Sequence, residues 1–473
     1  MSTSNPWLIL ETAIPKTNIR FPLQKRVMTA DEHPNVLVVL TDQQRWDTLS
    51  AYGCPLDLTP TLDGLATRGT VLKQAITPQP LCGPFRAMFQ SGKYASEVDV
   101  WRDTMPISTD ELRLAQQFKD AGYDVGYVGN WHISGTFDDP IPEDLRGAYE
   151  DFWIAADVPE FTSSPMDGHL FGSDNDPVEF ASYRADAFTD FAREAIESLS
   201  EPFFLVVAYL EPHNQNDMMT YAAPDGYAEP YKKRPYVPED LRNRPGDWYD
   251  ELPDYYGTIK RLDECVDELL SELSARGIED ETIVSYTADH GCHFRTRPGE
   301  YKRTPHESAV RVPAVLSGPG FDTGTDIETP TSLIDLPPTL LDAAGLDIPD
   351  AMHGESFLPV AHGDRPDADG DAFIQLSESQ VGRALRTEQW KYGVAATSST
   401  GWRGGSGAKS SDTYVERYLY DLARDPHEQV NLAGRPDFRS VADDLQARLL
   451  EYIETVEGES PRIRPYENGY SVF

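Results

Sequence analysis

Residues 36–45 read VLVVLTDQQR. The first six are apolar or β-branched without interruption, which is the pattern of a strand buried on both faces. Polar residues follow at once, and open α/β sheets place their ligands at the carboxyl ends of such strands. This stretch therefore predicts a buried strand that leads directly into a candidate site at Asp42 and Gln43.

The same arrangement recurs along the chain. Strand-like apolar runs occupy 123–129, 203–210, 282–288 and 311–317, and helical patterns lie between them at 60–66, 110–121, 183–199 and 255–275. Alternating strands and helices predict an α/β fold with a large, mostly parallel central sheet flanked by helices. Polar side chains that follow these strands would meet at one edge of the sheet, namely Asp42, Asn130, His132, His213, Asp289 and His290.

We expect three regions, because a chain of 473 residues exceeds the usual size of one domain. Residues 1–34 read as an N-terminal arm and 35–365 as the catalytic α/β domain. Shorter strand patterns and a terminal amphipathic helix at 441–456 make 366–473 a smaller C-terminal α+β subdomain, with an antiparallel sheet and a helix.

The chain is strongly acidic. It has 79 Asp and Glu residues against 41 Lys and Arg, a formal net charge of −38, and the acidic residues are spread throughout. This balance argues against nucleic acid or an anionic membrane as a partner. Acidic surfaces of this kind keep proteins soluble in high salt, so we expect a halophile's cytoplasm, which predicts loss of stability in low salt.

Cysteine usage agrees with a cytoplasmic location. The four cysteines, at 54, 82, 265 and 292, are too few and too scattered for a disulfide framework or a zinc cluster. No apolar leader or membrane-spanning stretch is apparent in the sequence.

A cysteine stands at the mouth of a predicted helix. Residues 79–92 read QPLCGPFRAMFQSG, in which Pro84 suits a first helical turn and Gly92 can end the helix. Cys82 would lie at the helix N-terminus, where free N–H groups favour an anion. Arg86, one turn on, can hold a position there with its fork of donors. Without further signals, a lone cysteine is more often buried and inert.

The polar residues at the strand ends suit a metal and an oxyanion. Asp42, Gln43 and Asp289 offer hard oxygen ligands, as Ca²⁺ or Mg²⁺ prefers, and the nitrogen of His290 adds Mn²⁺ to the candidates. Positive groups for an anionic substrate are supplied by Arg86, His132, His213 and Lys302.

These motifs together resemble the formylglycine-dependent sulfatases of the alkaline-phosphatase-like superfamily. The resemblance runs in the family's order over roughly residues 35–435. It is carried by Asp42-Gln43, Cys82-Gly83-Pro84-Phe85-Arg86, Gly129-Asn130-Trp131-His132, Pro212-His213, Asp289-His290-Gly291, Lys302 with Glu307 and Arg311-Val312-Pro313, and the 419–432 signature.

The resemblance implies a sulfuric ester hydrolase. Cys82 would be oxidised by a formylglycine-generating enzyme to an aldehyde, whose hydrate attacks a small sulfate ester of a sugar or an aryl alcohol. It implies a metal set of Asp42, Gln43, Cys82, Asp289 and His290, with Ca²⁺ preferred. Arg86, His132, His213 and Lys302 would act with Cys82 in catalysis, and Asn130, His132, His213 and Lys302 would bind substrate.

Two departures from the family pattern leave other functions open. Asn130 stands where the family usually has lysine, and Lys302, Arg295 or Arg297 would have to compensate for the missing cation. Gln43 replaces an aspartate, as in choline-sulfatase-like and phosphonate-hydrolase-like relatives. The alternatives are a phosphodiester or phosphonate monoester hydrolase on the same scaffold, and a non-catalytic metal-binding homologue with an unmodified Cys82.

The sequence does not define the alcohol part of the substrate. Two long segments, 137–180 and 214–253, read as loops that shape a pocket. Five aromatic residues in these segments could stack on a sugar or aryl group: Trp153, Phe161, Tyr227, Tyr231 and Trp248. His293 and His306 are expected in a further, exposed loop, either as substrate contacts or as solvated loop residues.

Overall fold

The structure of the protein is a computed structural model. The structure describes residues 33–111, 114–233, 235–297, 299–364, 370–378, 380–396 and 407–466. Almost all of the expected arm at 1–34, and the expected boundary at 365/366, lie outside the described residues. The described residues from Pro34 onward form one compact unit.

The central sheet has ten strands in the order β12-β2-β11-β9-β1-β8-β4-β5-β6-β7. β1 (Asn35–Thr41) lies inside it and pairs in parallel with β8 (Phe203–Ala208) and β9 (Thr282–Ala288), with Val38 opposite both Val206 and Ser285. β4 (Asp124–Asn130) pairs in parallel with β8. The parallel core therefore brings the carboxyl ends of β1, β4, β8 and β9 to one edge.

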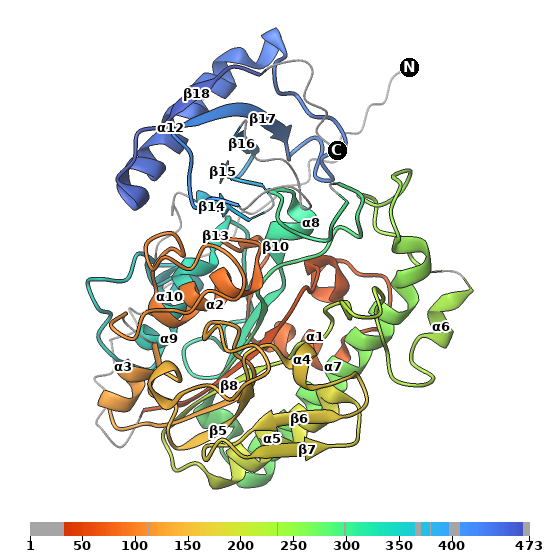
Figure 1. Ribbon diagram of the computed structural model, residues 1–473, viewed down its shortest axis with the longest axis vertical. Coiled ribbons are helices and arrows are strands. Elements are labelled where there is room, and N and C mark those ends of the chain that lie inside the picture. Colours follow the sequence, from red (N-terminus) through yellow and green to blue (C-terminus); the bar gives the residue numbers. More distant parts are fainter. Residues whose placement is uncertain are drawn as a thin grey trace, which may run out of the picture. The chain divides into compact units, whose positions relative to one another are not determined.

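Alternate residues of the parallel strands face opposite layers of helices (Figure 1). On one face, Val36 and Val38 pack in the cluster that contains apolar residues of α2 (Cys82–Ser91), α3 (Leu114–Asp120) and α9 (Leu336–Ala343). On the other face, Leu37 and Val39 pack in the cluster that contains α1 (Pro60–Arg68), α5 (Arg184–Ser198) and α7 (Trp248–Arg276). Both faces are covered, which explains the unbroken apolar runs.

The remaining elements are short. The further strands are β2 (Thr70–Leu72), β3 (Ala75–Ile76), β5 (Phe152–Ala156), β6 (Gly168–Phe171), β7 (Pro177–Phe180), β10 (Arg311–Val312), β11 (Ala314–Ser317), β12 (Thr325–Ile327) and β13 (Thr331–Ser332). The further helices are α4 (Pro159–Thr162), α6 (Glu229–Lys232), α8 (Glu307–Val310) and α10 (Leu358–Ala361). Single 3₁₀ turns are η2 (Trp46–Thr48), η3 (Ser50–Tyr52), η4 (Glu143–Leu145), η5 (Glu279–Glu281), η6 (Leu333–Asp335) and η7 (Pro436–Phe438).

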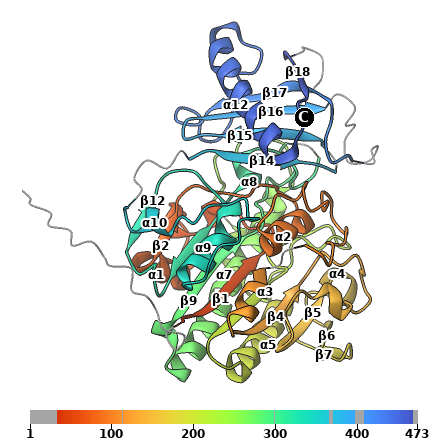
Figure 2. The same ribbon diagram turned by 90° about the vertical axis from the view of Figure 1, so that its left-hand side faces the viewer.

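A second sheet follows in the C-terminal part of the chain (Figure 2). Strands β14 (Ala372–Leu376), β15 (Gly382–Arg386), β16 (Trp390–Ala396) and β17 (Thr413–Asp421) pair antiparallel in that order, and β18 (Arg462–Arg464) adds in parallel to β17. The helix α12 (Arg439–Glu457) packs on this sheet through its buried leucines. The predicted fold class is thereby confirmed.

Two segments differ from expectation. The run 311–317 is not one strand: β10 pairs with β3 in a small separate sheet, while β11 joins the central sheet antiparallel to β9. Pro313 separates them, because proline has no N–H to donate to a ladder. The segment 137–180 is not a long loop, since it holds β5, α4, β6 and β7 and extends the central sheet.

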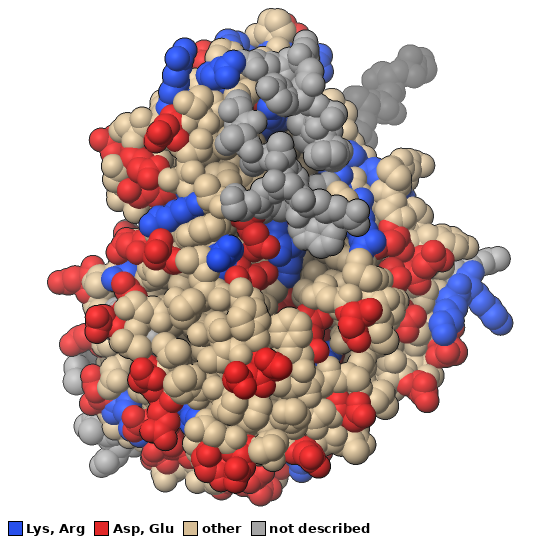
Figure 3. All heavy atoms as spheres, in the orientation of Figure 1, with Lys and Arg blue, Asp and Glu red and all other residues tan. Residues whose placement is uncertain are grey.

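Many of the acidic residues lie on the surface. Figure 3 shows Asp and Glu spread over much of the visible face. None of the described helices is both long and apolar enough to span a membrane.

Candidate active site

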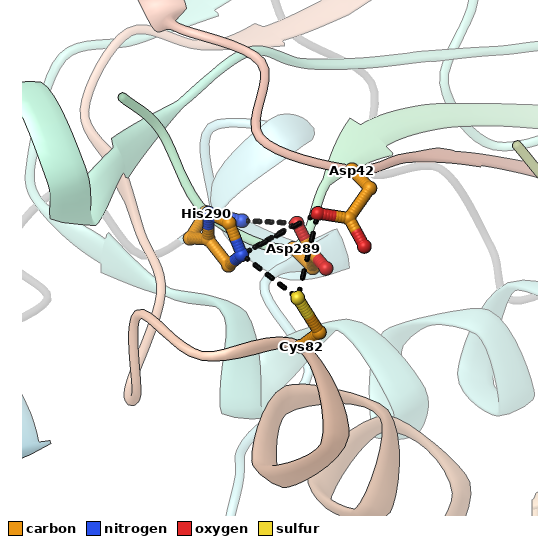
Figure 4. Close-up of side chains that lie close together, drawn as sticks. All are labelled: Asp42, Cys82, Asp289 and His290. Carbon is orange, nitrogen blue, oxygen red and sulfur yellow. Dashed lines mark hydrogen bonds and ion pairs between the residues drawn. The ribbon is translucent and has the colours of Figure 1, made fainter. Parts of the chain in front are cut away.

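Four side chains meet at the carboxyl edge of the central sheet (Figure 4). Asp42 follows β1, Asp289 and His290 follow β9, and Cys82 is the first residue of α2. One donor atom from each lies within 4.8 Å of the others, and all four residues are buried. The Cys82 Sγ lies 3.5 Å from Asp42 Oδ1 and 3.3 Å from His290 Nε2. The structure thus brings together four of the five predicted metal ligands.

The donor set suits a divalent cation. His290 Nδ1 lies 3.0 Å from the carbonyl of Gly291, to which it donates, so the lone pair of Nε2 faces the cluster, where Lys302 lies 3.1 Å away. The Asp289 Oδ1 accepts the backbone N–H groups of Gln43 and His290, while its buried Oδ2 has no hydrogen bond among the described residues and only an ion pair with Arg86 at 3.7 Å. A bound cation would satisfy this oxygen more fully.

The charges around Asp42 and Asp289 differ. Burial alone would raise the pKa of Asp42, but the surrounding histidines, Lys302 and Arg86 lower it below its usual range. Burial and the neighbouring Asp42 raise the pKa of Asp289 well above its usual range. Two carboxylates this close repel each other, and a divalent cation between them would relieve that repulsion.

Gln43 is held by its own neighbours. Its side-chain oxygen accepts hydrogen bonds from the Asn214 N–H at 3.2 Å and the Tyr221 hydroxyl at 2.8 Å. Its backbone has a φ of 68°, a left-handed conformation that costs free energy in a residue other than glycine. What Gln43 gives the cluster directly is its backbone N–H, on Asp289; metal ligation by its amide oxygen stays a prediction.

Arg86 and Asn130 both contact the same carboxylate oxygen of Asp42, Oδ2. Arg86 Nη2 lies 3.3 Å and Asn130 Nδ2 lies 3.4 Å from Asp42 Oδ2, and Arg86 Nη1 donates to the carbonyl of Asn130 at 2.6 Å. Neither residue is among those that line the adjacent cavity. In this arrangement they orient the Asp42 carboxylate, and their predicted contact with substrate stays a prediction.

Lys302 reaches the cluster from a loop. Its Nζ donates to the Cys82 Sγ at 2.7 Å, and it lies 3.1 Å from His290 Nε2 and 3.3 Å from His213 Nε2. Burial opposes its charge, but Cys82, Asp42 and Asp103 raise its pKa above the usual range. A buried ammonium group therefore points at the side chain of residue 82.

His213 stays neutral beside Lys302. Its Nδ1 lies 2.6 Å from the carbonyl of Asn214, which makes Nδ1 the protonated nitrogen and Nε2 an acceptor for Lys302. Burial, with the charge of Lys302, lowers the pKa of His213.

His132 and an unpredicted residue, Asp103, complete the inner wall. One donor atom each of Cys82, Asp103 and His132 lie within 4.8 Å of one another. Asp103 Oδ1 accepts the N–H of Gly83 at 2.9 Å, so it satisfies a free donor at the start of α2. Burial opposes its ionisation, but His132, Lys302 and Arg303 lower the pKa of Asp103 to about 2.

The C-terminal sheet holds the loop that carries Lys302. Glu307 forms ion pairs with Lys391 of β16 at 2.7 Å and with Arg386 of β15 at 3.3 Å. Arg303, next to Lys302, pairs with Glu378 at 2.9 Å. These contacts fix both ends of the segment 302–307, which explains how a distant sheet supports the site.

A cavity of about 540 Å³ opens from the cluster. Of the predicted site residues it is lined by Asp42, Gln43, Cys82, His132, His213 and Lys302. Phe161 alone lines it among the five predicted aromatics; Trp153, for example, is buried in the core. Arg295 also lines it, whereas Arg297 donates to backbone carbonyls of His427 and Glu428.

The expectation that His293 and His306 lie in exposed loops was wrong. Both side chains are buried, and neither lines the cavity. His306 lies 2.9 Å from the Thr304 hydroxyl and 3.2 Å from the Tyr420 hydroxyl, so the C-terminal part covers it.

The fold and the cluster define a hydrolase of the alkaline-phosphatase-like type. The family model described as "Sulfatase" matches residues 34–346, and a model described as "N-sulphoglucosamine sulphohydrolase, C-terminal" matches 299–400. The chain belongs to the sulfatase family, and it is an enzyme that hydrolyses sulfuric esters.

Known relatives align over most of their length. An ulvan-active sulfatase of Formosa agariphila is 29% identical over 90% of this chain and 82% of its own. A choline-sulfatase of Rhizobium meliloti is 24% identical over 85% of this chain and 83% of its own. A solved structure in complex with D-glucosamine-2-N,6-O-disulfate superposes with a TM-score of 0.72 at 20% identity, over 91% of this chain and 99% of the other.

Proposed function

We propose that this sulfatase works through formylglycine made from Cys82 and a divalent cation, Ca²⁺ before Mg²⁺ or Mn²⁺, held by Asp42, Asp289 and His290. The observation that carries the proposal is the meeting of these donors with Cys82 within 4.8 Å. The hydrated aldehyde would supply the nucleophilic oxygen, and the cation would stabilise negative charge on it and on the sulfate. Gln43 is the fifth candidate ligand.

The residues around the cluster have separate tasks. Arg86 and Asn130 fix the Asp42 carboxylate, and the Nδ1 hydrogen bond of His290 to Gly291 fixes its ring. Lys302 places its ammonium group 2.7 Å from the side chain of residue 82, where a sulfate oxygen would bind. His132 lies on the wall of the same cavity.

Protonation of the leaving oxygen falls to Lys302 rather than His213. The single ring N–H of neutral His213 is used on the Asn214 carbonyl, and its Nε2 accepts from Lys302. Of these two residues, only Lys302 therefore holds a proton on the cavity side. His213 then orients Lys302, and Lys302 regains its proton from solvent after the ester is cleaved.

The substrate is a small sulfate ester of a sugar or an aryl alcohol. The sugar reading is supported by the ulvan-active relative and by the neighbour bound to a glucosamine disulfate. A formylglycine-generating enzyme is the required partner. We further propose a cytoplasmic setting in high salt, supported by the charge of −38; a protein equally stable to urea in low and high salt would contradict it.

Two measurements test the mechanism. Mass spectrometry of the peptide that holds residue 82, from the native host, should find the aldehyde, and a Cys54→Ser variant should keep it. The same preparation should release the aryl alcohol from an aryl sulfate faster than from the matched aryl phosphodiester. An intact thiol at position 82 in active enzyme, or faster cleavage of the phosphodiester, would overturn the proposal.

A further inference from the structure

Among the described residues, the outer part of the cavity, beyond the cluster around Cys82, offers no cation that lacks a neighbouring carboxylate. Two guanidinium groups reach it, those of Arg295 and Arg303. Arg303 is already surrounded by three carboxylates, since it pairs with Glu378 at 2.9 Å, Glu300 at 3.1 Å and Asp103 at 3.2 Å. The charge of this arginine is therefore more than compensated within the protein.

Arg295 is compensated in the same way. Its guanidinium lies 3.2 Å from the carboxylate of Asp247 and 4.7 Å from the ring centre of Tyr301. The Tyr301 hydroxyl donates to the same aspartate at 2.6 Å. The charge of Arg295 is therefore offset by Asp247, and an anion that used its other N–H groups would also come close to that carboxylate.

Glu160 adds negative charge to the lining of the same cavity. It accepts hydrogen bonds from the backbone N–H and the side-chain amide of Asn216, at 3.0 and 2.8 Å. The Nδ1 atom of His213, a neutral side chain, lies 3.8 Å from Oε1 of Glu160. No Lys or Arg of the described residues forms an ion pair with Glu160. The carboxylate would repel an anion placed in this half of the cavity.

The rim beside Glu160 is apolar. Phe161 and Met219 line the cavity and expose 61% and 48% of their surface. The ring of Phe137 lies 6.1 Å from that of Phe161, and Met218 adjoins Met219. Three of the eight large apolar side chains exposed among the described residues, Phe137, Phe161 and Met219, thus lie at this rim. Exposed apolar groups that gather beside a cavity mark a ligand surface.

We propose that the alcohol part of the substrate is uncharged and presents an apolar or aromatic face to Phe161 and Met219, and that esters with a second sulfate or a carboxylate are rejected. This inference rests on the proposed function, because it describes the leaving group of the same reaction. One sulfate is bound at the inner end by Lys302 and the cluster, and the outer end repels a second.

Matched esters test the charge. The formylglycine-containing holoenzyme is given 4-(carboxymethyl)phenyl sulfate and its neutral amide at low salt, then N-acetylglucosamine 6-sulfate and glucosamine 2-N,6-O-disulfate. Whichever pair of esters the enzyme cleaves, we expect kcat/KM to be about tenfold higher for the ester whose only charged group is one sulfate, mainly because its KM is lower. The ratio of the two kcat/KM values should fall as the salt concentration rises. Equal or better cleavage of the doubly charged ester would overturn the inference alone. Failure to release sulfate from all four would overturn the proposed function as well.

Two variants assign the effect to the outer wall. Glu160→Gln removes the negative charge, so the ratio of kcat/KM for the amide ester to kcat/KM for the carboxylate ester should fall about threefold or more. Phe161→Ala should raise KM for the amide about fivefold, while Tyr249→Ala, which removes an aromatic side chain 68% exposed and outside the cavity, should not. An unchanged ratio in the first variant and an unchanged KM in the second would contradict the assignment, even if both proteins lost some stability.

Discussion

The two ends of the cavity differ in origin and in chemistry. The inner end is built from residues that follow strands of the central sheet, such as Asp42 and Asp289, and it gathers ligands for a cation and a buried lysine. The outer end is built from connecting segments, and it presents Glu160 and the apolar rim at Phe161. On the proposed function, the sulfate would bind at the strand ends and the alcohol at the connecting segments. Changes in one of these parts could then alter substrate choice without altering how the sulfate is bound.

The largest effect should come from residue 82. Replacing Cys82 with alanine removes the precursor of the nucleophile, so kcat for sulfate release should fall by about four orders of magnitude or more. Burial of a methyl group in place of the thiol is mild, and the thermal midpoint should change little. Substantial residual turnover in purified Cys82→Ala protein would mean that the inner end does not supply the nucleophile.

The second prediction concerns the cation site. Asp289→Asn keeps the size and the Oδ1 acceptor for two N–H groups but removes the negative charge. Affinity for Ca²⁺, measured by calorimetry on protein first treated with chelator, should fall by about 100-fold, with a matching loss of kcat/KM at limiting metal. The exposed change Asp444→Asn is the control. Equal affinity in both variants would place the cation elsewhere.

A third prediction tests the support of the inner end by the C-terminal sheet. Lys391 is fully buried between Glu307 and Glu428, at 2.7 and 2.8 Å. Lys391→Met would leave two buried carboxylates with one cation fewer, so the free energy of unfolding should drop by about 3–5 kcal/mol in urea titrations.

A surface ion pair provides the comparison for Lys391. Arg68 and Glu279 lie 3.0 Å apart but are half or one-third exposed, so Arg68→Met should cost about 1 kcal/mol or less. If the two variants lose similar stability, the buried cluster does not anchor the loop that carries Lys302.

The smallest effect is the response to pH. Burial and Lys302 lower the pKa of His213, so it gains a proton only below the usual histidine range, and Lys302, whose pKa is raised, stays charged above neutrality. Between about pH 6.5 and 9, kcat/KM for a neutral aryl ester should therefore neither rise nor fall through titration of either group. A change in kcat/KM near pH 6.5 that disappears in His213→Gln would show that His213 is protonated in the working range.

The inner end could be predicted because its pattern is local. The runs that became β1, β8 and β9 are apolar throughout, since both faces are covered, and the polar residues directly after them converge at one edge. The strand β5 was missed because its five residues are embedded in a segment rich in Asp, Pro and Gly, and β7 is largely exposed.

The outer end and the supports of the site could not be predicted, because they depend on contacts between distant residues. Glu378 accepts a hydrogen bond from the N–H of Asp103, 275 residues earlier in the chain, and no periodicity connects the two. Glu160 stands in a four-residue helix that gives no recognisable pattern. Only the folded chain shows that Asp103 and Glu378 both pair with Arg303, and that Glu160 lines the same cavity as Arg303.

The burial of Cys82 sets the order of events in making the active enzyme. The side chain is 2% exposed and lies at the inner end of the cavity, beneath Lys302. In the finished fold, the residues on both sides of the cysteine form β3, the start of α2 and the packed turn between them. On the proposed mechanism, oxidation of Cys82 would therefore have to reach the segment 79–92 before the chain folds around it. The fraction of active molecules would then reflect the relative rates of oxidation and folding, and protein that folds first would stay inactive.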